Sequence, residues 1–314
     1  MDTIGVRRNI GRGIRWLALL VVSTVIGSGC GRDSSGIPAE QAASWRKALD
    51  ADRAAKDREF ASDAMSPMAG AARLTLAAPG GGLRVAAGAV TPTAPSGPDD
   101  PLVFSLADGQ WRWESRAPGG WAEVARSPIP PGPLSEGIRF RLERFTLAAY
   151  PGADGLTLIV FDPARRERRE FRRLLYFPPD RAFAVPARLE RLPDPETVVM
   201  LTSRNLEKRF VRYARLHFTV DGTACALAAF KSAAGASDDR TLFVPFTDAT
   251  TGAETYPAGR FLDLDEPAGE TVVLDFNRAY NPLCNYSPAY NCPIPPAENR
   301  LPVAIRAGEL TYPH

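Results

Sequence analysis

Histidine and lysine are scarce in this chain of 314 residues. The two histidines are His217 and His314, and lysine supplies only four of the 38 basic residues. So few imidazoles argue against histidine-based catalytic triads, histidine-rich metal sites and most zinc hydrolases. The formal net charge of +2 is too small for a dedicated nucleic-acid-binding protein. The sequence also has no glycine-rich phosphate loop, so we expect no metal, no cofactor and no nucleic-acid partner.

Long apolar runs are scarce as well, and the run that stands out extends from Trp16 to Ile26. Its 11 residues are fewer than the ~20 that a bilayer-spanning helix needs. Arginines precede it and the small residues 27–29 follow it, which is typical of an export signal. Cys30 comes next and resembles the lipobox cysteine of bacteria, which is diacylated and becomes the mature N-terminus. We therefore predict a signal peptide over 1–29 and lipidation of Cys30; soluble export, a retained anchor and twin-arginine export are the alternatives.

Gly31 follows the cysteine, where an aspartate would resemble an inner-membrane retention signal. The predicted location is therefore the bacterial cell envelope, with the lipid in the outer membrane and the protein facing the periplasm.

The remaining chain has the pattern of a helix followed by many short strands. Residues 30–38 are polar and predict a tether, and residues 39–66 predict a helix with Trp45 and Phe60 on one side. Two β units follow, over 70–164 and 165–314, and turns such as Asp108-Gly109 separate their strands. The predicted fold class is mainly β, with two sandwich or barrel-like sheet units and one N-terminal packing helix.

Two segments of the β region need separate mention. Residues 165–173 contain six arginines among nine residues, which indicates a solvated ribbon; a site for an anionic glycan or lipid headgroup is the alternative. Residues 301–307 alternate apolar and polar positions and predict a strand, as do residues 271–277.

The cysteines offer one pairing. Cys284 and Cys292 frame a short loop, and an exported protein meets an oxidising compartment, so we predict a disulfide; a metal site and a redox-active pair are the alternatives. Cys225 lies in an apolar strand and is predicted to be a buried thiol. His217 alternates with apolar neighbours and is predicted to lie on a sheet face.

Polar residues cluster around this cysteine loop. Asp275 and Asn277 alternate with apolar residues and are expected on the solvent face, where Asp275 would pair with Arg306 if their strands are neighbours. A structural polar network, a ligand site with Arg278 or Arg300 on an anion and Tyr280 stacking, and acid/base catalysis by Asp275 and Glu298 are the three interpretations. The candidate residues are Asp275, Asn277, Arg278, Tyr280, Asn281, Glu298, Asn299, Arg300 and Arg306.

A second polar cluster surrounds the turn at Thr250-Thr251-Gly252. It either joins the first cluster in space or decorates a turn. Its members are Asp248, Tyr256, Arg260 and Asp263.

Residues 241–309 closely resemble the bacterial family of unknown function numbered 1684. The resemblance is carried by runs such as Thr-Leu-Phe-Val-Pro-Phe at 241–246, Val-Leu-Asp-Phe-Asn-Arg at 273–278 and Pro-Pro-Ala-Glu-Asn-Arg-Leu-Pro-Val-Ala-Ile-Arg-Ala-Gly-Glu at 295–309. The run at 169–178 looks like the same family, and the resemblance extends over about residues 42–310. It implies no activity. Some members have a first half like a forkhead-associated sandwich, and residues 70–162 resemble a remnant of it without a phosphothreonine site.

These observations favour a non-enzymatic binding or scaffold protein of the cell envelope. The alternatives are a hydrolase of envelope glycans or esters acting through Asp275 and Glu298, and a carrier of a small apolar or anionic ligand. A hydrolase predicts converging carboxylates in an open cleft, a carrier predicts a closed apolar cavity, and a scaffold predicts an exposed apolar patch. The expected partners are the membrane, through the lipid, and an envelope protein or a small molecule.

Overall fold

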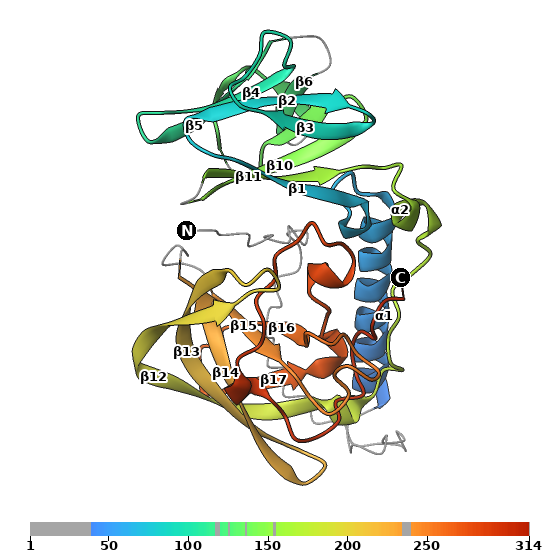
Figure 1. The fold of residues 1–314 in the computed structure, drawn as a ribbon. Helices are drawn as coiled ribbons and strands as arrows, with labels where there is room; N and C mark the ends of the chain where they lie inside the picture. The colour runs from blue at the N-terminus through green and yellow to red at the C-terminus, as the bar shows by residue number, and fades with distance from the viewer. Residues whose placement is uncertain are drawn as a thin grey trace.

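The computed structural model describes residues 39–313, apart from 117–119, 125, 136, 153–154 and 234–239. The predicted signal peptide 1–29, the tether 30–38 and Cys30 lie outside the described residues. Two facing sheets form the upper part of the molecule, a third sheet forms the lower part, and one long helix runs beside both (Figure 1). The predicted class, mainly β with one N-terminal helix, is confirmed.

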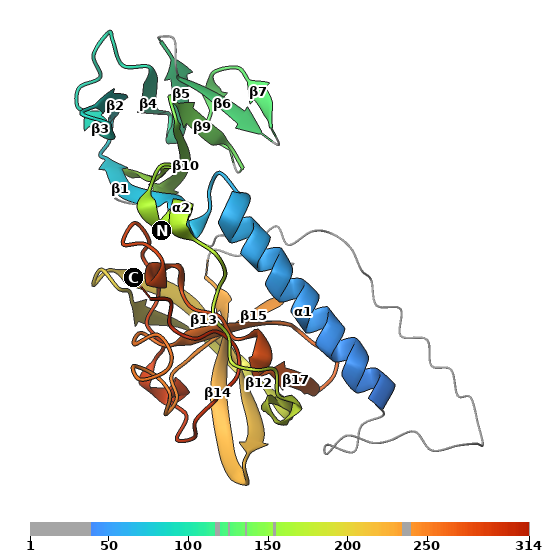
Figure 2. The ribbon, with the colours of Figure 1, turned by 90° about the vertical axis from the view of Figure 1, so that its right-hand side faces the viewer.

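The helix α1 (Ala39–Ser62) forms where alanines and long side chains favour a helix. Leu49 and Phe60 on its inner side are each 1% exposed, and the Phe60 ring meets Tyr286 edge-on at 4.9 Å. After the helix, Ser66 accepts a hydrogen bond from the backbone of Met68 and caps the short helix η1 (Pro67–Ala69). Figure 2 shows α1 running from the lower sheet to the base of the upper sheets, so it joins the two parts. Among the described residues, no helix is long and apolar enough to cross a membrane.

The upper part is a sandwich of two antiparallel sheets. Their buried aromatic side chains meet in the middle, where Phe140 lies 4.9 Å from Phe104 and 5.4 Å from Trp113, both edge-on. The two-residue turn at Asp108-Gly109 has positive φ at both positions, as a hairpin of this kind requires. One sheet has the order β1 (Gly70–Leu76), β11 (Gly155–Phe161), β10 (Phe145–Gly152), β9 (Arg139–Leu142), β6 (Gly120–Val124), β7 (Ser127–Ile129). The other has the order β3 (Ala89–Thr93), β2 (Gly80–Ala86), β4 (Leu102–Ala107), β5 (Gln110–Ser115), β8 (Gly132–Pro133).

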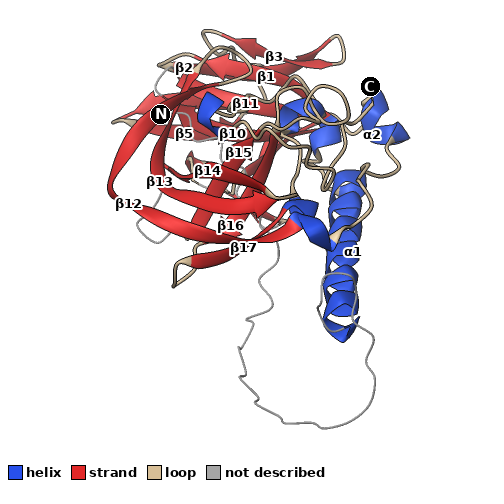
Figure 3. Cartoon of the chain, turned by 90° about the horizontal axis from the view of Figure 1, so that it is seen from below, coloured by secondary structure: helices blue, strands red, loops and turns tan. Residues whose placement is uncertain are grey.

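The lower part is one antiparallel sheet that curves into a nearly closed, barrel-like shape (Figure 3). Its two long strands bend at irregularities between Arg191 and Glu196 and between Arg212 and Ala214, which increase strand curvature. Large apolar side chains such as Phe218, Phe246 and Phe276 fill its inner face. The strand order is β16 (Arg260–Asp265), β15 (Thr241–Phe246), β14 (Thr223–Ser232), β13 (Glu207–Val220), β12 (Ala184–Leu201), β17 (Thr271–Asp275).

The chain after β17 winds over this sheet in irregular form. The predicted strand over 301–307 is wrong, because these residues form no strand and belong to a loop. Leu301, Ile305 and Ala307 are at most 2% exposed and fill the core of the curved sheet, which explains their apolar alternation. Three short helices interrupt the segment: η3 (Phe276–Arg278), η4 (Leu283–Asn285) and η5 (Ala297–Asn299). Along the chain, α2 (Arg166–Glu170) and η2 (Arg181–Phe183) come between β11 and β12.

Candidate functional site

Asp275 lies at the end of β17, beside α1. Its Oδ2 accepts a hydrogen bond from Trp45 Nε1 at 2.8 Å, and its Oδ1 accepts from the backbone N and the Nδ2 of Asn277 at 3.1 and 2.9 Å. Arg278 Nε lies 3.5 Å from the same carboxylate. Asp275 and Asn277 are 9% and 1% exposed, so the prediction that both face solvent is wrong. The strand ends at Asp275 and η3 begins, which breaks the alternation of the two faces.

Arg306 does not pair with Asp275. Its Nη2 lies 3.0 Å from Glu254 Oε1, and both side chains are largely exposed. The expected pairing required a strand at 301–307 beside β17, and the strand bonded to β17 is β12 instead.

Asn277 and Arg278 each fasten a different neighbouring segment. Asn277 Nδ2 donates to the carbonyl of Asp180 at 2.8 Å, and its Oδ1 accepts from the backbone N of Asp180 at 2.9 Å. Arg278 forms an ion pair with Asp52 of α1. These contacts tie the end of β17 to the segment before β12 and to the helix.

Tyr280 and Asn281 have separate partners again. The Tyr280 hydroxyl donates to Asp263 Oδ2 at 2.7 Å, so Asp263 of the second predicted cluster is joined to a residue of the first. Asn281 Nδ2 donates to the carbonyl of Leu310 at 2.7 Å.

Asn299 is a buried junction between β14 and β15. Its Oδ1 accepts from the backbone N of Ala228 at 2.7 Å, and its Nδ2 donates to the carbonyls of Ala228 and Pro245 at 2.9 and 2.7 Å. The side chain is 0% exposed. Its amide therefore satisfies backbone groups where the two strands part, since they share a single paired position.

Glu298 and Arg300 flank this asparagine on the surface. Glu298 Oε1 lies 2.6 Å from Arg212 Nη2, and its Oε2 lies 3.6 Å from Arg215 Nη2. Arg300 is exposed, and its side chain forms no ion pair within the described part of the chain. Asp275 and Glu298 thus each have partners of their own and are not bonded to one another.

Asp248 and Arg260 form a buried ion pair in the second cluster. Arg260 Nη2 lies 3.0 Å from Asp248 Oδ2, and the two side chains are 1% and 0% exposed. The guanidinium also donates to the carbonyls of Ile305, Ala307 and Glu309, and Asp248 accepts from the backbone N of Ile305 at 2.8 Å. Burial lowers the pKa of Arg260, and the nearby carboxylate opposes that shift. These hydrogen bonds satisfy backbone groups of the final segment that a neighbouring strand would otherwise pair with. Tyr256, another member of this cluster, is half-buried, and burial raises its pKa.

A buried polar network around Glu309 escaped the sequence interpretation. Glu309 pairs with Lys56 of α1, and the two side chains are 2% and 13% exposed. Its Oε2 accepts from the Tyr286 hydroxyl and from the backbone N of Asn281, both at 2.8 Å. Burial raises the pKa of Tyr286 well above its usual value. The available signal was Lys56 itself, one of four lysines, on the apolar side of the predicted helix.

Two of the described cysteines form a disulfide, and Cys225 is a buried thiol. The predicted disulfide Cys284–Cys292 is confirmed, with its Cα atoms 6.2 Å apart. Cys225 is buried, as predicted, and burial raises its pKa. His217 lies on the outer face of β13, with Nε2 2.6 Å from Glu190 Oε2.

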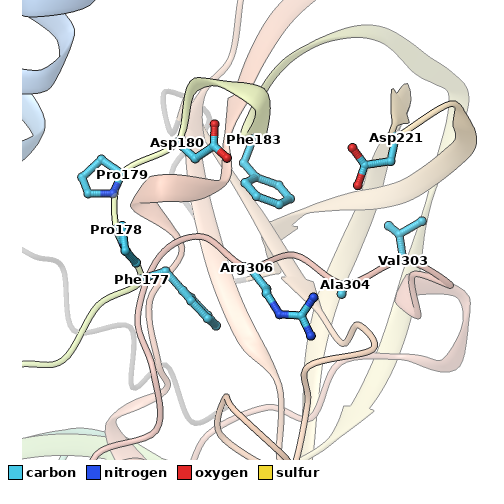
Figure 4. A pocket seen from close by; sticks show the side chains of 9 residues that line it. All are labelled: Phe177, Pro178, Pro179, Asp180, Phe183, Asp221, Val303, Ala304 and Arg306. Atoms are coloured by element: carbon cyan, nitrogen blue, oxygen red, sulfur yellow. The ribbon is translucent and has the colours of Figure 1, made fainter.

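An open pocket of about 650 Å³ lies beside the C-terminal segment (Figure 4). The segment that precedes β12 forms one wall, and the β13–β14 turn and residues 303–306 form the other. Asp180 and Asp221 contribute two carboxylates, while the charge of Arg306 is shared with Glu254. The pocket therefore presents no unpaired cation for an anionic ligand. Its lining residues are Phe177, Pro178, Pro179, Asp180, Phe183, Asp221, Val303, Ala304 and Arg306.

Three apolar side chains are exposed together on the outer face of the lower sheet. Val199, Leu201 and Ile294 are 51%, 55% and 41% exposed, and we call them the apolar strip. Leu206, at the adjacent turn, is 44% exposed. Between the two exposed positions of β12, Met200 faces the core and is 3% exposed.

Backbone pairing places the members of the apolar strip side by side. Thr202 and Pro293 form an antiparallel bridge, and Ile294 N donates to the carbonyl of Leu201 at 2.8 Å. Leu201 and Ile294 are therefore opposite one another on one face. Across β13, Arg209 lies opposite Val199, and Glu207 lies opposite Leu201.

A family match locates a region of known sequence similarity in the second half of the chain. Residues 169–310 match a family model described as a protein of unknown function, DUF1684. A solution NMR structure of an uncharacterised protein from Haloarcula marismortui is 43% identical; the match covers 48% of this chain and 83% of that chain, with a TM-score of 0.40. A search of the curated proteins gave no match. The matched range contains β12 to β17, the apolar strip and both polar clusters.

Proposed function

The chain belongs to the DUF1684 family through residues 169–310, and the description of that family names no activity. We therefore propose a function from the surfaces and contacts of this chain. The protein is a non-enzymatic binding protein of the bacterial cell envelope. It is held at the outer membrane by a lipid on Cys30, and it docks an envelope protein on the apolar strip.

The apolar strip is the observation that carries this proposal. Exposed apolar side chains scattered singly are ordinary, but neighbouring ones on a rigid sheet favour association with a partner. Val199, Leu201 and Ile294 are adjacent on one face. β13 pairs with Val199 and Leu201, and the bridge at Thr202 holds Ile294 beside Leu201. Arg209 and Glu207 border them, which suits a polar rim around an apolar centre.

The polar clusters support a binding role over catalysis. Asp275 accepts three hydrogen bonds from α1 and from its own turn, and Glu298 is paired with two arginines. An acid/base pair would need both carboxylates to converge on one open space. Their partners instead join segments of the fold, which is the arrangement expected of a structural network.

Site-specific photo-crosslinking of the full chain in its native envelope tests the docking site. A photoreactive residue at Leu201 should give a discrete adduct with another envelope protein. The same probe at Thr219, exposed on the same face of the lower sheet, is the control and should not. Ile294→Ser should weaken the Leu201 adduct, whereas Val273→Ser, at an exposed apolar residue outside the strip, should leave it unchanged.

Three results would overturn this assignment. Identical adducts from Leu201 and Thr219 would remove the apolar strip as the docking site, and an adduct of two copies of this chain would replace a partner protein with self-association. Turnover of an envelope glycan or ester that is lost in Asp275→Ala would establish the hydrolase instead.

Fractionation of cells tests the location separately. After a wash with about 0.5 M salt, which screens electrostatic contacts with the membrane, the wild-type chain should be recovered with outer membranes. Cys30→Ala should leave them, since a diacyl chain contributes most of the membrane affinity. Retention of the variant in the same fraction would contradict lipid anchoring at Cys30.

A further inference from the structure

The nine residues 165–173, which we call the arginine strap, are anchored firmly at both ends. Arg165 Nη1 donates to the carbonyl of Gly70 at 2.8 Å, and Arg165 Nε lies 3.1 Å from Glu167. At the other end Phe171 is 6% exposed and packs 5.9 Å from the Phe60 ring. Just beyond, Leu174 N donates to Asp57 at 2.8 Å. The strap is thus fixed to both the sandwich and α1.

The strap carries six arginines and two glutamates, so positive charge is in excess along it. Glu167 is engaged by Arg165, which leaves Glu170 as the remaining acidic side chain of the strap. Five of its arginines form no ion pair within the part of the chain that the structure describes. Several arginines elsewhere do lie against a carboxylate, as Arg144 does with Asp162 at 3.0 Å. The five are Arg166, Arg168, Arg169, Arg172 and Arg173.

The exposed arginines are turned to solvent on a fixed support. Arg166, Arg169, Arg172 and Arg173 are all exposed, and Arg172 also donates to the carbonyl of Phe171 at 3.3 Å. A guanidinium binds phosphate oxygens with two parallel N–H groups, which a lysine cannot do. Because the strap backbone is already ordered, binding an anion there costs little additional conformational entropy.

We propose that the arginine strap binds the phosphate groups of an anionic phospholipid membrane. Its charge complements such a surface, where several cations on one face bind many headgroups at once. α2 lies on the outside of the molecule, near the Ser62 end of α1 and away from β12 (Figures 1 and 2). The strap can therefore meet a membrane while the apolar strip is free for a protein. This contact is separate from the lipid on Cys30 and from the docking proposed above.

Vesicle flotation of the full chain carrying Cys30→Ser tests the strap without an acyl chain. The probes are vesicles of phosphatidylcholine alone and vesicles with about one third phosphatidylglycerol. Each arginine at an anionic surface strengthens binding about fivefold. Arg166→Gln/Arg169→Gln/Arg173→Gln should therefore weaken binding to the anionic vesicles about a hundredfold. Binding to the neutral vesicles should stay unchanged, because residues 1–29 are the same in every variant.

Matched variants separate the strap from overall charge and from folding. Arg84→Gln/Arg112→Gln/Arg126→Gln removes the same charge from exposed arginines elsewhere and should bind anionic vesicles like the parent chain. Replacing the same three arginines of the strap by lysine should retain much of the affinity for anionic vesicles, since the positive charge is kept. In about 0.5 M salt the difference between parent and strap variant should shrink strongly, because the Debye length falls to a few ångström. Thermal unfolding of each variant confirms that it is folded.

Three results would overturn the proposal. One is equal binding of the parent chain and the strap variant to anionic vesicles. A second is an equal loss in the control triple variant, which would make the effect one of net charge. The third is that soluble polyglutamate or RNA displaces the chain from anionic vesicles at micromolar concentration, which would make the strap a polyanion site and not a membrane site.

Discussion

Replacing Arg260 by methionine should destabilise the protein far more than the same change at Arg306. Both guanidiniums lie 3.0 Å from a carboxylate, but the Arg260–Asp248 side chains are 1% and 0% exposed, and the Arg306–Glu254 side chains are 61% and 38% exposed. The shortest N–O distance is thus matched, and burial differs. Arg260→Met leaves the Asp248 carboxylate buried without its cation and deprives three carbonyls of the final segment of a donor.

Breaking a buried ion pair on one side costs about 3–5 kcal/mol, whereas an exposed pair contributes about 0–1 kcal/mol. For a chain of this size, 1 kcal/mol corresponds to a change of roughly 2–4 °C in Tm. Arg260→Met should therefore lower Tm by about 10 °C, and Arg306→Met by no more than about 4 °C.

Thermal unfolding followed by circular dichroism and calorimetry measures both variants. Asp248→Asn should also be strongly destabilising, and the double variant with Arg260→Met should lose less than the sum of the two, because no uncompensated charge is left buried. Equal Tm values for Arg260→Met and Arg306→Met, or strictly additive losses in the double variant, would refute the reasoning that burial makes this pair important.

Three further predictions concern other contacts. Burial raises the pKa of Glu266, but hydrogen bonds from Lys231, Tyr213 and Arg191 outweigh it and lower the pKa to about 2. The stability that the ionised carboxylate contributes is therefore present above the usual pKa of 4.5 and is lost as pH falls from there toward 2. Glu266→Gln should flatten the acid limb of a stability–pH curve, and an unchanged limb would contradict this. Reduction of Cys284–Cys292, or Cys292→Ser, should cost about 2–3 kcal/mol in urea unfolding, from the entropy of an eight-residue separation; no change in midpoint on adding reductant would count against it. Trp45→Phe keeps the packing of α1 but removes the 2.8 Å bond to Asp275, with an expected loss of about 1.5–3 kcal/mol for a bond to a charged group; an unaltered unfolding midpoint would show that this bond does not hold the helix.

Several features follow from local chemistry and could be predicted from the sequence. The turn at Asp108-Gly109 forms as expected because these residue types adopt the positive φ that a two-residue hairpin needs, and Asp221-Gly222 has the same conformation. The helix, the mainly β class and the disulfide are confirmed for a similar reason, since each depends on nearby residues or on a short loop. The leader and Cys30 stay predictions, as does the envelope function.

The partners of the polar residues depended on the tertiary structure. Asp275 bonds Trp45 across 230 positions of sequence, and Glu309 bonds Lys56 across 253, separations that no local pattern encodes. The apolar alternation at 301–307 predicts a strand because a period of two arises wherever an extended segment buries one side. Here that side faces the core, and Arg260 and Asp248 supply the hydrogen bonds that a neighbouring strand would have supplied.

The apolar strip and the arginine strap likewise depend in part on the local sequence and in part on the tertiary structure. The sequence determined that residues 165–173 carry six arginines and that Val199 and Leu201 are apolar. Only the folded chain decided that five of those arginines have no ion pair among the described residues, and that Ile294 lies opposite Leu201 on an exposed face. Composition and local backbone preference are properties of adjacent residues, whereas burial and charge compensation depend on which distant segments the fold brings together.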